Sequence, residues 1–262
     1  MAGEGMGRYA FGDNDLAALR LAKVAEVFAP ASRAFLLECA EAEPGLALDL
    51  GCGPGYTTRM VSEALHPRRT VGMDRSSSFL DVARPTATKG VSFIQHDVTQ
   101  VPFPTGAADL VYCRFLLTHL ARPEAQVARW ATQLRPGGLL LIEEVEAIRT
   151  ENPVFGAYLE VVAAMLAHRG NELYVGALLD AAPDAPSLRR QSSRVATLSP
   201  TMRQAAGMFL MNLRVWRNGS FIRSAYPDRV IDGLESDLAA LGGSDDSACI
   251  TWKLRQISYG RA

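Results

Sequence analysis

The most informative segment of this chain is residues 46–58, which read LALDLGCGPGYTT. A short apolar run carries Asp49 near its end, three glycines then alternate with other residues, and helix-compatible residues follow. This order predicts a buried strand, a tight turn and the start of a helix. Because glycine lacks a Cβ atom, the turn can adopt positive φ angles and a ligand can lie against bare backbone. The amides at the following helix start favour a negatively charged ligand group.

Outward from this segment, short apolar runs alternate with helical patterns. These runs do not alternate between apolar and polar residues, which is typical of strands that helices cover on both faces. Repeated strand–helix units with short connections predict a doubly wound, mostly parallel α/β sheet with right-handed crossovers. Strands are expected at residues 46–50, 70–74, 91–95, 108–113 and 139–145, and helices at 57–65, from 77 to 82 and at 123–134.

The flanks of this core have a different character. Two helices, at residues 14–28 and 32–42, are expected before the core, with Pro30 ending the first. After residue 147 the pattern is mainly helical, and the chain ends in alternating residues that predict a last strand. The expected later elements are helices at 154–168 and 202–216, a strand at 193–198 and the terminal strand within 248–259.

We therefore expect one domain with three parts. Residues 1–45 form an N-terminal helical cap, residues 46–147 a nucleotide-binding core, and residues 148–262 a substrate-side part with a helical lid.

Composition excludes several classes of protein. The chain has 262 residues, 48% of them hydrophobic and 21% charged, which is the balance of a globular protein with a substantial core. A net charge of −1 provides no general attraction to nucleic acid. No apolar run approaches the roughly 20 residues needed to span a bilayer, and no signal peptide is recognised. The scattered cysteines predict free thiols, a cytoplasmic location and no metal site.

The glycine segment resembles motif I of the class I S-adenosylmethionine (SAM)-dependent methyltransferases. The resemblance rests on the G-x-G-x-G spacing, with Asp49 two residues ahead of Gly51. It implies that Asp49, Gly51, Cys52, Gly53 and Gly55 bind SAM, with the Asp49 carboxylate near the amine of its methionine end. On the residues alone, Asp49 could instead only hold the glycine turn in place. The resemblance also implies a Rossmann-like seven-stranded sheet of order 3-2-1-4-5-7-6, with a helical insertion before the last strand.

The next two strand ends carry carboxylates. Asp74 ends the second strand, about 20 residues after the glycine loop, where an acidic residue can accept two hydrogen bonds from a ribose. Arg75 follows it and is expected to flank the nucleoside. Asp97 ends the third strand, and the resemblance implies that it accepts from the adenine amine while Val98 lines the ring. Asp97 could instead cap a helix.

The fourth strand leads into a segment that resembles the family's motif IV region. Backbone around Cys113 and Arg114 is expected to line the methionine end of SAM. His119 is the candidate catalytic base, since an unperturbed imidazole titrates near neutral pH; a purely structural role in tying the loop to the sheet is the alternative. Glu144, on the fifth strand, is expected to face the substrate. The absence of an Asn/Asp-Pro-Pro-Tyr/Phe motif after the fourth strand favours a small-molecule substrate over nucleic-acid bases.

The first 20 residues resemble an N-terminal element of UbiE-like and natural-product methyltransferases. There it folds over the cofactor, so the resemblance implies that Tyr9 binds the cofactor and Phe11 the substrate. An aromatic face attracts the positive sulfonium, and Arg20 can bind the methionine carboxylate. Ordinary packing of the aromatics and an exposed arginine are the alternative. The resemblance covers residues 46–146 most strongly.

These features predict a SAM-dependent methyltransferase that acts on an O, N or C atom of a small organic molecule of secondary metabolism. S-adenosylhomocysteine would be the product, without metal, membrane or nucleic-acid partner, and a homodimer is compatible with the sequence. A SAM-binding cyclase or rearrangement enzyme is an alternative. An NAD(P)-dependent oxidoreductase is another, but Tyr56 stands where a G-x-G-x-x-G loop requires Gly or Ala.

Overall fold

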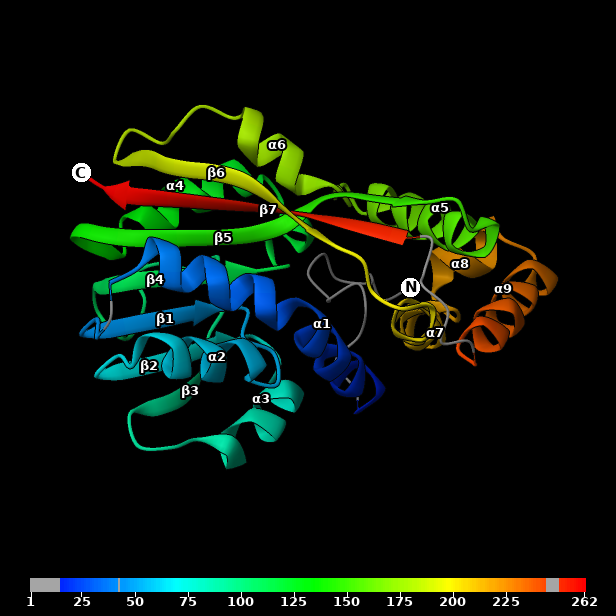
Figure 1. Cartoon of the computed structure of the whole chain (residues 1–262), viewed down its shortest axis with the longest axis horizontal. Helices are drawn as coiled ribbons and strands as arrows, with labels where there is room; N and C mark the ends of the chain where they lie inside the picture. Colours follow the sequence, from blue (N-terminus) through cyan, green and yellow to red (C-terminus); the bar gives the residue numbers. More distant parts are fainter. Residues whose placement is uncertain (1–14, 42, 244–249) are drawn as a thin grey trace, which may run out of the picture.

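The computed structural model describes residues 15–41, 43–243 and 250–262. A seven-stranded sheet occupies one half of the elongated molecule and a group of helices the other (Figure 1). The strand order is β3-β2-β1-β4-β5-β7-β6, as predicted. The strands are β1 (Leu46–Leu50), β2 (Arg69–Asp74), β3 (Val91–Gln95), β4 (Ala108–Arg114), β5 (Leu134–Thr150), β6 (Leu188–Leu198) and β7 (Ile250–Arg261).

Nine α-helices lie within the described residues. They are α1 (Asp15–Cys39), α2 (Tyr56–Leu65), α3 (Ser77–Ala83), α4 (Pro123–Ala131), α5 (Pro153–His168), α6 (Val175–Ala181), α7 (Met202–Trp216), α8 (Ser220–Ala225) and α9 (Asp228–Leu241). None of these helices is long and apolar enough to cross a membrane.

The first five strands run parallel, and β7 lies antiparallel between β5 and β6. Helices α1 and α2 cover one face of the sheet, where Phe35, Val61 and Tyr112 are buried together. Helices α4 and α6 cover the other face, where Trp130 and Leu179 pack on the strands. Because both faces are covered, the central strands are apolar throughout, which is why their sequence does not alternate.

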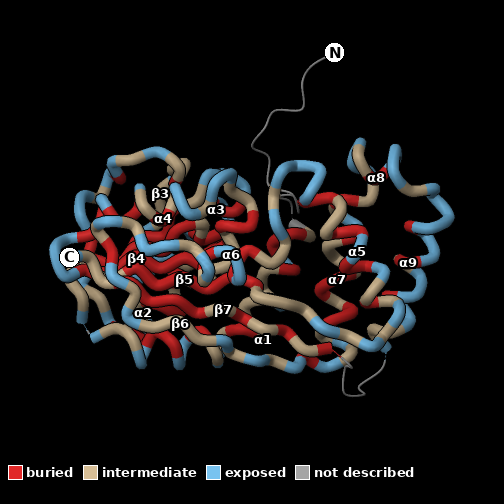
Figure 2. Tube along the Cα trace, turned by 90° about the horizontal axis from the view of Figure 1, so that it is seen from above, coloured by how far each residue is buried: buried red, intermediate tan, exposed pale blue. Residues whose placement is uncertain are grey.

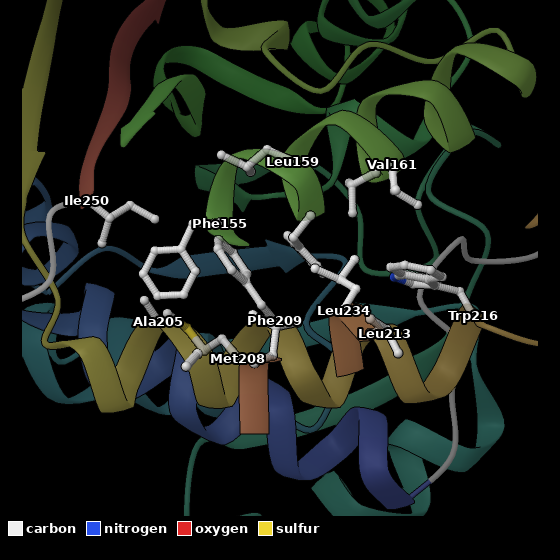
Figure 3. Packing of buried hydrophobic residues seen from close by; sticks show 14 of the residues in the cluster. Phe155, Leu159, Val161, Ala205, Met208, Phe209, Leu213, Trp216, Leu234 and Ile250 are labelled. Atoms are coloured by element: carbon white, nitrogen blue, oxygen red, sulfur yellow. The ribbon is translucent and has the colours of Figure 1, made fainter. Parts of the chain in front are cut away.

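The helical half has a core of its own. Side chains from α5, α7 and α9 meet there, together with the N-terminal end of β7 (Figure 3). The strands β5 and β7 continue into this half beyond the end of β4, with Thr150 pairing Ile250 at the far end. Buried residues occur in both halves (Figure 2), and β5 itself is continuously buried from Leu140 to Val145. The predicted helical insertion before the last strand is thus a packed body.

The N-terminal prediction of two helices is wrong, because α1 is a single helix with the exposed Pro30 inside it. Proline removes one backbone hydrogen bond and disturbs the preceding turn. Buried residues on both sides, Phe28 and Phe35, hold the two parts of the helix against separate cores. Tertiary packing therefore outweighs the tendency of Pro30 to end the helix.

Several element boundaries also differ from the prediction. β5 begins at Leu134 and ends at Thr150, because pairing with β7 sustains it well past residue 145. β6 begins at Leu188, and the helices α6, α8 and α9 have no counterpart in the predicted elements. The thiols of Cys39, Cys52 and Cys113 are free, as predicted for these three. No cluster of metal-ligating side chains occurs in residues 15–41, 43–243 and 250–262.

Candidate cofactor site

The carboxyl ends of β1, β2 and β4 lie next to one another at one edge of the sheet. The glycine loop follows β1 directly. Gly51, Gly53 and Gly55 have φ angles of 69°, 51° and 83°, a region that favours glycine. The amides of Gly51 and Cys52 both donate to the Met73 carbonyl, at 2.8 and 3.0 Å. These bonds fix the loop against the neighbouring strand, so the predicted tight turn between strand and helix is present.

Two of the three glycines are confined by their neighbours. A Cβ atom on Gly51 would lie 2.9 Å from the Leu116 side chain, and one on Gly55 would lie 2.7 Å from the Phe93 ring. At Gly53 the nearest side chain, Leu21 of α1, would be 3.4 Å away. The loop is therefore a close-fitting backbone surface with its greatest clearance at Gly53, the arrangement that a ligand lying against main chain requires.

Asp49 is fully enclosed beneath this loop. Its Oδ2 accepts hydrogen bonds from the hydroxyls of Thr57 and Thr58, both at 2.6 Å. Burial raises the pKa of this carboxyl to about 6, with the two hydroxyl bonds acting in the opposite direction. Asp49 thus ties the strand end to the first turn of α2, which supports the structural alternative without excluding a ligand contact. The sequence reasoning missed both threonines, although their position at a helix start was a usable signal.

Asp74 joins the second strand end to the glycine loop. Its Oδ2 accepts from the Gly53 amide and its Oδ1 from the Ser76 amide, each at 2.8 Å. Burial raises the pKa of this carboxyl, and the two amides oppose the rise. Each carboxylate oxygen retains a second lone pair. Asp74 can therefore hold the loop and still accept hydroxyl groups, as its predicted ribose role requires.

The three residues expected around the adenine, at the ends of β2 and β3, each make different contacts within the protein. Asp97 Oδ1 accepts from the amide and the hydroxyl of Thr99, at 2.9 and 2.7 Å, which is an Asx turn with no helix after it. Val98 is buried, and its carbonyl accepts from the Trp130 indole at 2.8 Å. Arg75 is exposed, and its carbonyl accepts from Gln95. The alternative that Asp97 caps a helix is wrong.

The end of β4 brings Cys113 and Arg114 to the same edge. The Cys113 side chain is buried in the core on the α4 and α6 face. Arg114 points toward α1 and donates to the Ser32 hydroxyl at 2.9 Å. Phe115 follows with φ 55°, an uncommon conformation for a bulky residue, and its amide donates to the Glu143 carbonyl at 3.0 Å. The side chains of Cys113 and Arg114 are thus engaged within the protein, and the expectation that their backbone lines the methionine end of SAM remains a prediction.

Glu144 holds the loop that follows β4. Its Oε1 accepts from the amides of Leu116 and Leu117, at 2.8 and 2.6 Å, and the side chain is fully buried. Burial raises the pKa of Glu144 to about 8, against the effect of the backbone amides. These bonds make it a positioning residue for the segment that covers Gly51. Glu143, in contrast, accepts from Tyr112 and Gln256 on the opposite face of the sheet.

His119 ends the short 3-10 helix η2 (Leu117–His119) beside this loop. Burial lowers the pKa of its imidazole to about 3, and the charges of Arg20 and Arg169 lower it further. An imidazole with so low a pKa is a weak base. The environment of His119 therefore favours the structural alternative over the predicted catalytic role.

Arg20 is buried on α1, one residue before the Leu21 side chain that covers Gly53. Its charge influences both His119 and Tyr158, so it lies between the cofactor edge and the helical half. The alternative of an exposed arginine is wrong, whereas the predicted binding of the methionine carboxylate by Arg20 remains a prediction. Tyr9 and Phe11 lie outside the described residues.

Comparison with known proteins agrees with this geometry. Residues 48–142 match the family described as methyltransferase domain (Methyltransf_11). A putative methyltransferase from Bacillus halodurans C-125 shares the fold, with a TM-score of 0.55 and 18% identity over 88% of this chain and 98% of that one. The strand order gives the chain the Rossmann-like fold of class I methyltransferases. The matched residues 48–142 carry the glycine loop and the strand-end carboxylates.

Two further relatives carry named activities. A trans-aconitate 2-methyltransferase of Paracidovorax citrulli is 34% identical over 97 residues, 37% of each protein. Geranyl diphosphate C-methyltransferase from Streptomyces coelicolor A3(2), solved with Mg²⁺, geranyl diphosphate and S-adenosyl-L-homocysteine, has a TM-score of 0.51 and 17% identity over 98% of this chain and 89% of that one. The first of the curated relatives are matched over only 34–37% of their own length. The sequence likeness to these curated relatives therefore concerns only part of each protein.

Proposed function

We propose that this protein is a SAM-dependent methyltransferase that acts on a small organic molecule. The observation that carries the proposal is the glycine loop between β1 and α2, held by Asp49 from below and by Asp74 from the side, inside the matched methyltransferase domain. A family match of this kind does not favour a nicotinamide-dependent oxidoreductase or a SAM-dependent cyclase. A cytoplasmic location and a role in secondary metabolism remain predictions.

The residues at the strand ends fit SAM. Asp74 has lone pairs for ribose hydroxyls beyond those it uses on the loop amides. The Gly53 surface offers bare backbone, and the segment held by Glu144 covers Gly51 in the same loop. Buried Arg20, next to the residue that covers Gly53, suits the carboxylate of the methionine end. When bound, SAM supplies an electrophilic methyl group on a positively charged sulfur.

The chain's own contribution to the reaction would be alignment. Methyl transfer is an in-line displacement, and holding two reactants in line can lower the barrier by about 7–11 kcal/mol. The neutral, half-buried His119 lies in the 3-10 helix after β4, and its low pKa makes it a weak base. We infer that no strong side-chain base is needed, so the acceptor atom is nucleophilic as bound. The relatives named above act on small molecules, which supports a small-molecule acceptor here and no nucleic acid.

The proposal predicts that the purified protein binds SAM and S-adenosylhomocysteine in calorimetry and does not bind NADH. Asp74→Ala should weaken SAM binding about 100-fold, because it removes two charge-assisted hydrogen bonds to the ribose and loosens the Gly53 amide. Circular dichroism should show that the fold is retained.

Asp109→Ala is the matched control for this variant. Asp109 also accepts a backbone amide, that of Leu46 at 2.7 Å, but at the amino edge of the sheet. It should lose stability without losing SAM affinity. Unchanged SAM affinity in Asp74→Ala would contradict the site, and tight NADH binding without SAM binding would overturn the proposed function.

A further inference from the structure

The amino edge of the sheet, where the parallel strands begin, carries a pocket of its own. The pocket has a volume of about 480 Å³ and is lined by Arg68, Arg69 and Arg135, together with Gly106 and the first residue of β1, Leu46. β1 runs from this pocket toward the helical half (Figure 1). Its five residues, at about 3.3 Å each, place the pocket on the order of 15 Å from the glycine loop. The pocket is therefore separate from the candidate cofactor site.

One of the three guanidinium groups has an acidic partner. Arg135 Nη1 lies 3.0 Å from Asp109 Oδ1, and the other oxygen of Asp109 accepts from the Leu46 amide at 2.7 Å. Arg68 and Arg69 are exposed, and neither side chain forms an ion pair or a hydrogen bond with any described residue. The pocket therefore carries two positive charges that nothing in the described part of the chain neutralises. Because the whole chain has a net charge of −1, this positive excess is local.

The backbone that carries Arg68 and Arg69 is fixed in place. The Arg68 amide donates to the Pro44 carbonyl at 3.0 Å and the Arg69 amide to the Gly45 carbonyl at 3.1 Å, so the start of β2 is attached to the segment before β1. Elsewhere in the lining, a Cβ atom on Gly106 would meet no described atom within 4 Å. The arginines thus extend from a fixed support, and the pocket has room beside Gly106 for a bound molecule.

The chemistry of these side chains describes that molecule. Arginine presents five N–H donors in a planar fork that binds phosphate or carboxylate oxygens in pairs. A phosphate monoester has a charge of about −1.5 to −2 at pH 7, which matches the charges of Arg68 and Arg69 better than a single carboxylate does. The volume of the pocket lies within the range of about 300–1,000 Å³ that is typical of small-molecule sites. It can therefore hold an organic group as well as the phosphate.

We propose that this pocket binds the phosphate group of a small phosphorylated organic molecule, at a site distinct from those of SAM and of the methyl acceptor. The phosphate lies among Arg68, Arg69 and Arg135, and the organic part occupies the space beside Gly106. The inference does not depend on the proposed function, because the length of β1 separates the pocket from the glycine loop.

Calorimetry with three related probes tests this inference on the full chain. The probes are ribose 5-phosphate, ribonate, which carries one carboxylate, and ribose, which is uncharged. We expect ribose 5-phosphate to bind at least about tenfold more tightly than ribonate, because it offers more charge to the arginines, and ribose not to bind. The affinity should be the same with and without saturating S-adenosylhomocysteine, since the two sites are separate. Competition between the two ligands would place the phosphate at the cofactor edge and overturn the inference.

Variants of the exposed arginines identify the site. Arg69→Gln should weaken ribose 5-phosphate binding about tenfold, the effect of losing a hydrogen-bonded charged partner, and Arg68→Gln should do the same. Neither side chain has a partner in the described part of the chain, so both variants should keep the melting temperature of the parent protein. Arg229→Gln is the matched control, because it removes the same charge from an exposed position on α9. It should leave the affinity unchanged.

The outcomes separate this inference from the proposed function. The inference is overturned if ribose 5-phosphate does not bind, if ribonate binds equally tightly, or if Arg69→Gln and Arg229→Gln bind ribose 5-phosphate equally well. Failure of S-adenosylhomocysteine to bind overturns the proposed function alone, because the comparison of these two variants does not require it.

Discussion

Replacing Gly55 with alanine is expected to lower the free energy of unfolding by about 3 kcal/mol and to weaken SAM binding at least about tenfold. Two effects combine. Gly55 has φ 83°, where an alanine is strained by about 1 kcal/mol or more. Its new Cβ would also lie 2.7 Å from the Phe93 ring and 3.2 Å from Ala83, so the loop or the third strand must shift, at a further cost of about 1–3 kcal/mol. Urea unfolding and calorimetry with SAM measure the two quantities.

Gly106→Ala separates the strain from the clash. Gly106 has nearly the same φ angle, 80°, but no described atom within 4 Å of the position of a Cβ atom. It lies beside Gly45 and Leu46 at the amino edge of the sheet, away from the glycine loop. We expect it to cost about 1 kcal/mol and to leave SAM affinity unchanged. Equal losses in the two variants would show that the fit of Gly55 against Phe93 has no role in the cofactor site.

Glu144 is the second position where a large effect is expected. Glu144→Ala should lower the free energy of unfolding by about 3 kcal/mol, because the buried amides of Leu116 and Leu117 lose their acceptor. SAM affinity should fall as well, since Leu116 covers Gly51. Glu144→Gln keeps an acceptor oxygen of the same shape. It should remain within about 1 kcal/mol of the parent protein at pH 5, as urea unfolding would show.

The same pair of variants predicts a pH dependence. The pKa of Glu144 rises from 4.5 to about 8 on folding, so the folded state binds more protons than the unfolded state between these values. Its contribution to stability is therefore fully present below about pH 4.5 and is lost as the pH rises through about 8. The parent protein should lose on the order of 3–5 kcal/mol between these limits relative to Glu144→Gln. Parallel pH curves would contradict the buried, protonated state.

The cofactor half was largely predictable, because its signals are local. The run from Leu46 to Thr58 contains its own strand, turn and helix start, and each glycine occupies the positive-φ region that its residue type indicated. Asp74 likewise follows from position alone, since parallel strands end at one edge of a sheet. The order of all seven strands was also predicted, through the family resemblance.

What could not be predicted depends on tertiary packing. Nothing near Pro30 indicates that Phe28 and Phe35 hold the helix together on both sides of it. The role of Glu144 depends on a loop almost 30 residues earlier in the chain, whose amides no residue pattern reveals.

Helix α1 and strands β5 and β7 extend through both halves of the molecule, so the two halves share packing that is lost together on unfolding. Helix α1 packs on α2 through Phe35 and Leu36 and on the helical core through Phe28, while β5 and β7 run through both halves as one paired ribbon. Unfolding of either core would remove much of the packing that stabilises these elements. The two halves should therefore melt in a single cooperative transition. A fragment limited to the matched residues 48–142 would lack α1 and β7, so we expect that it does not fold on its own.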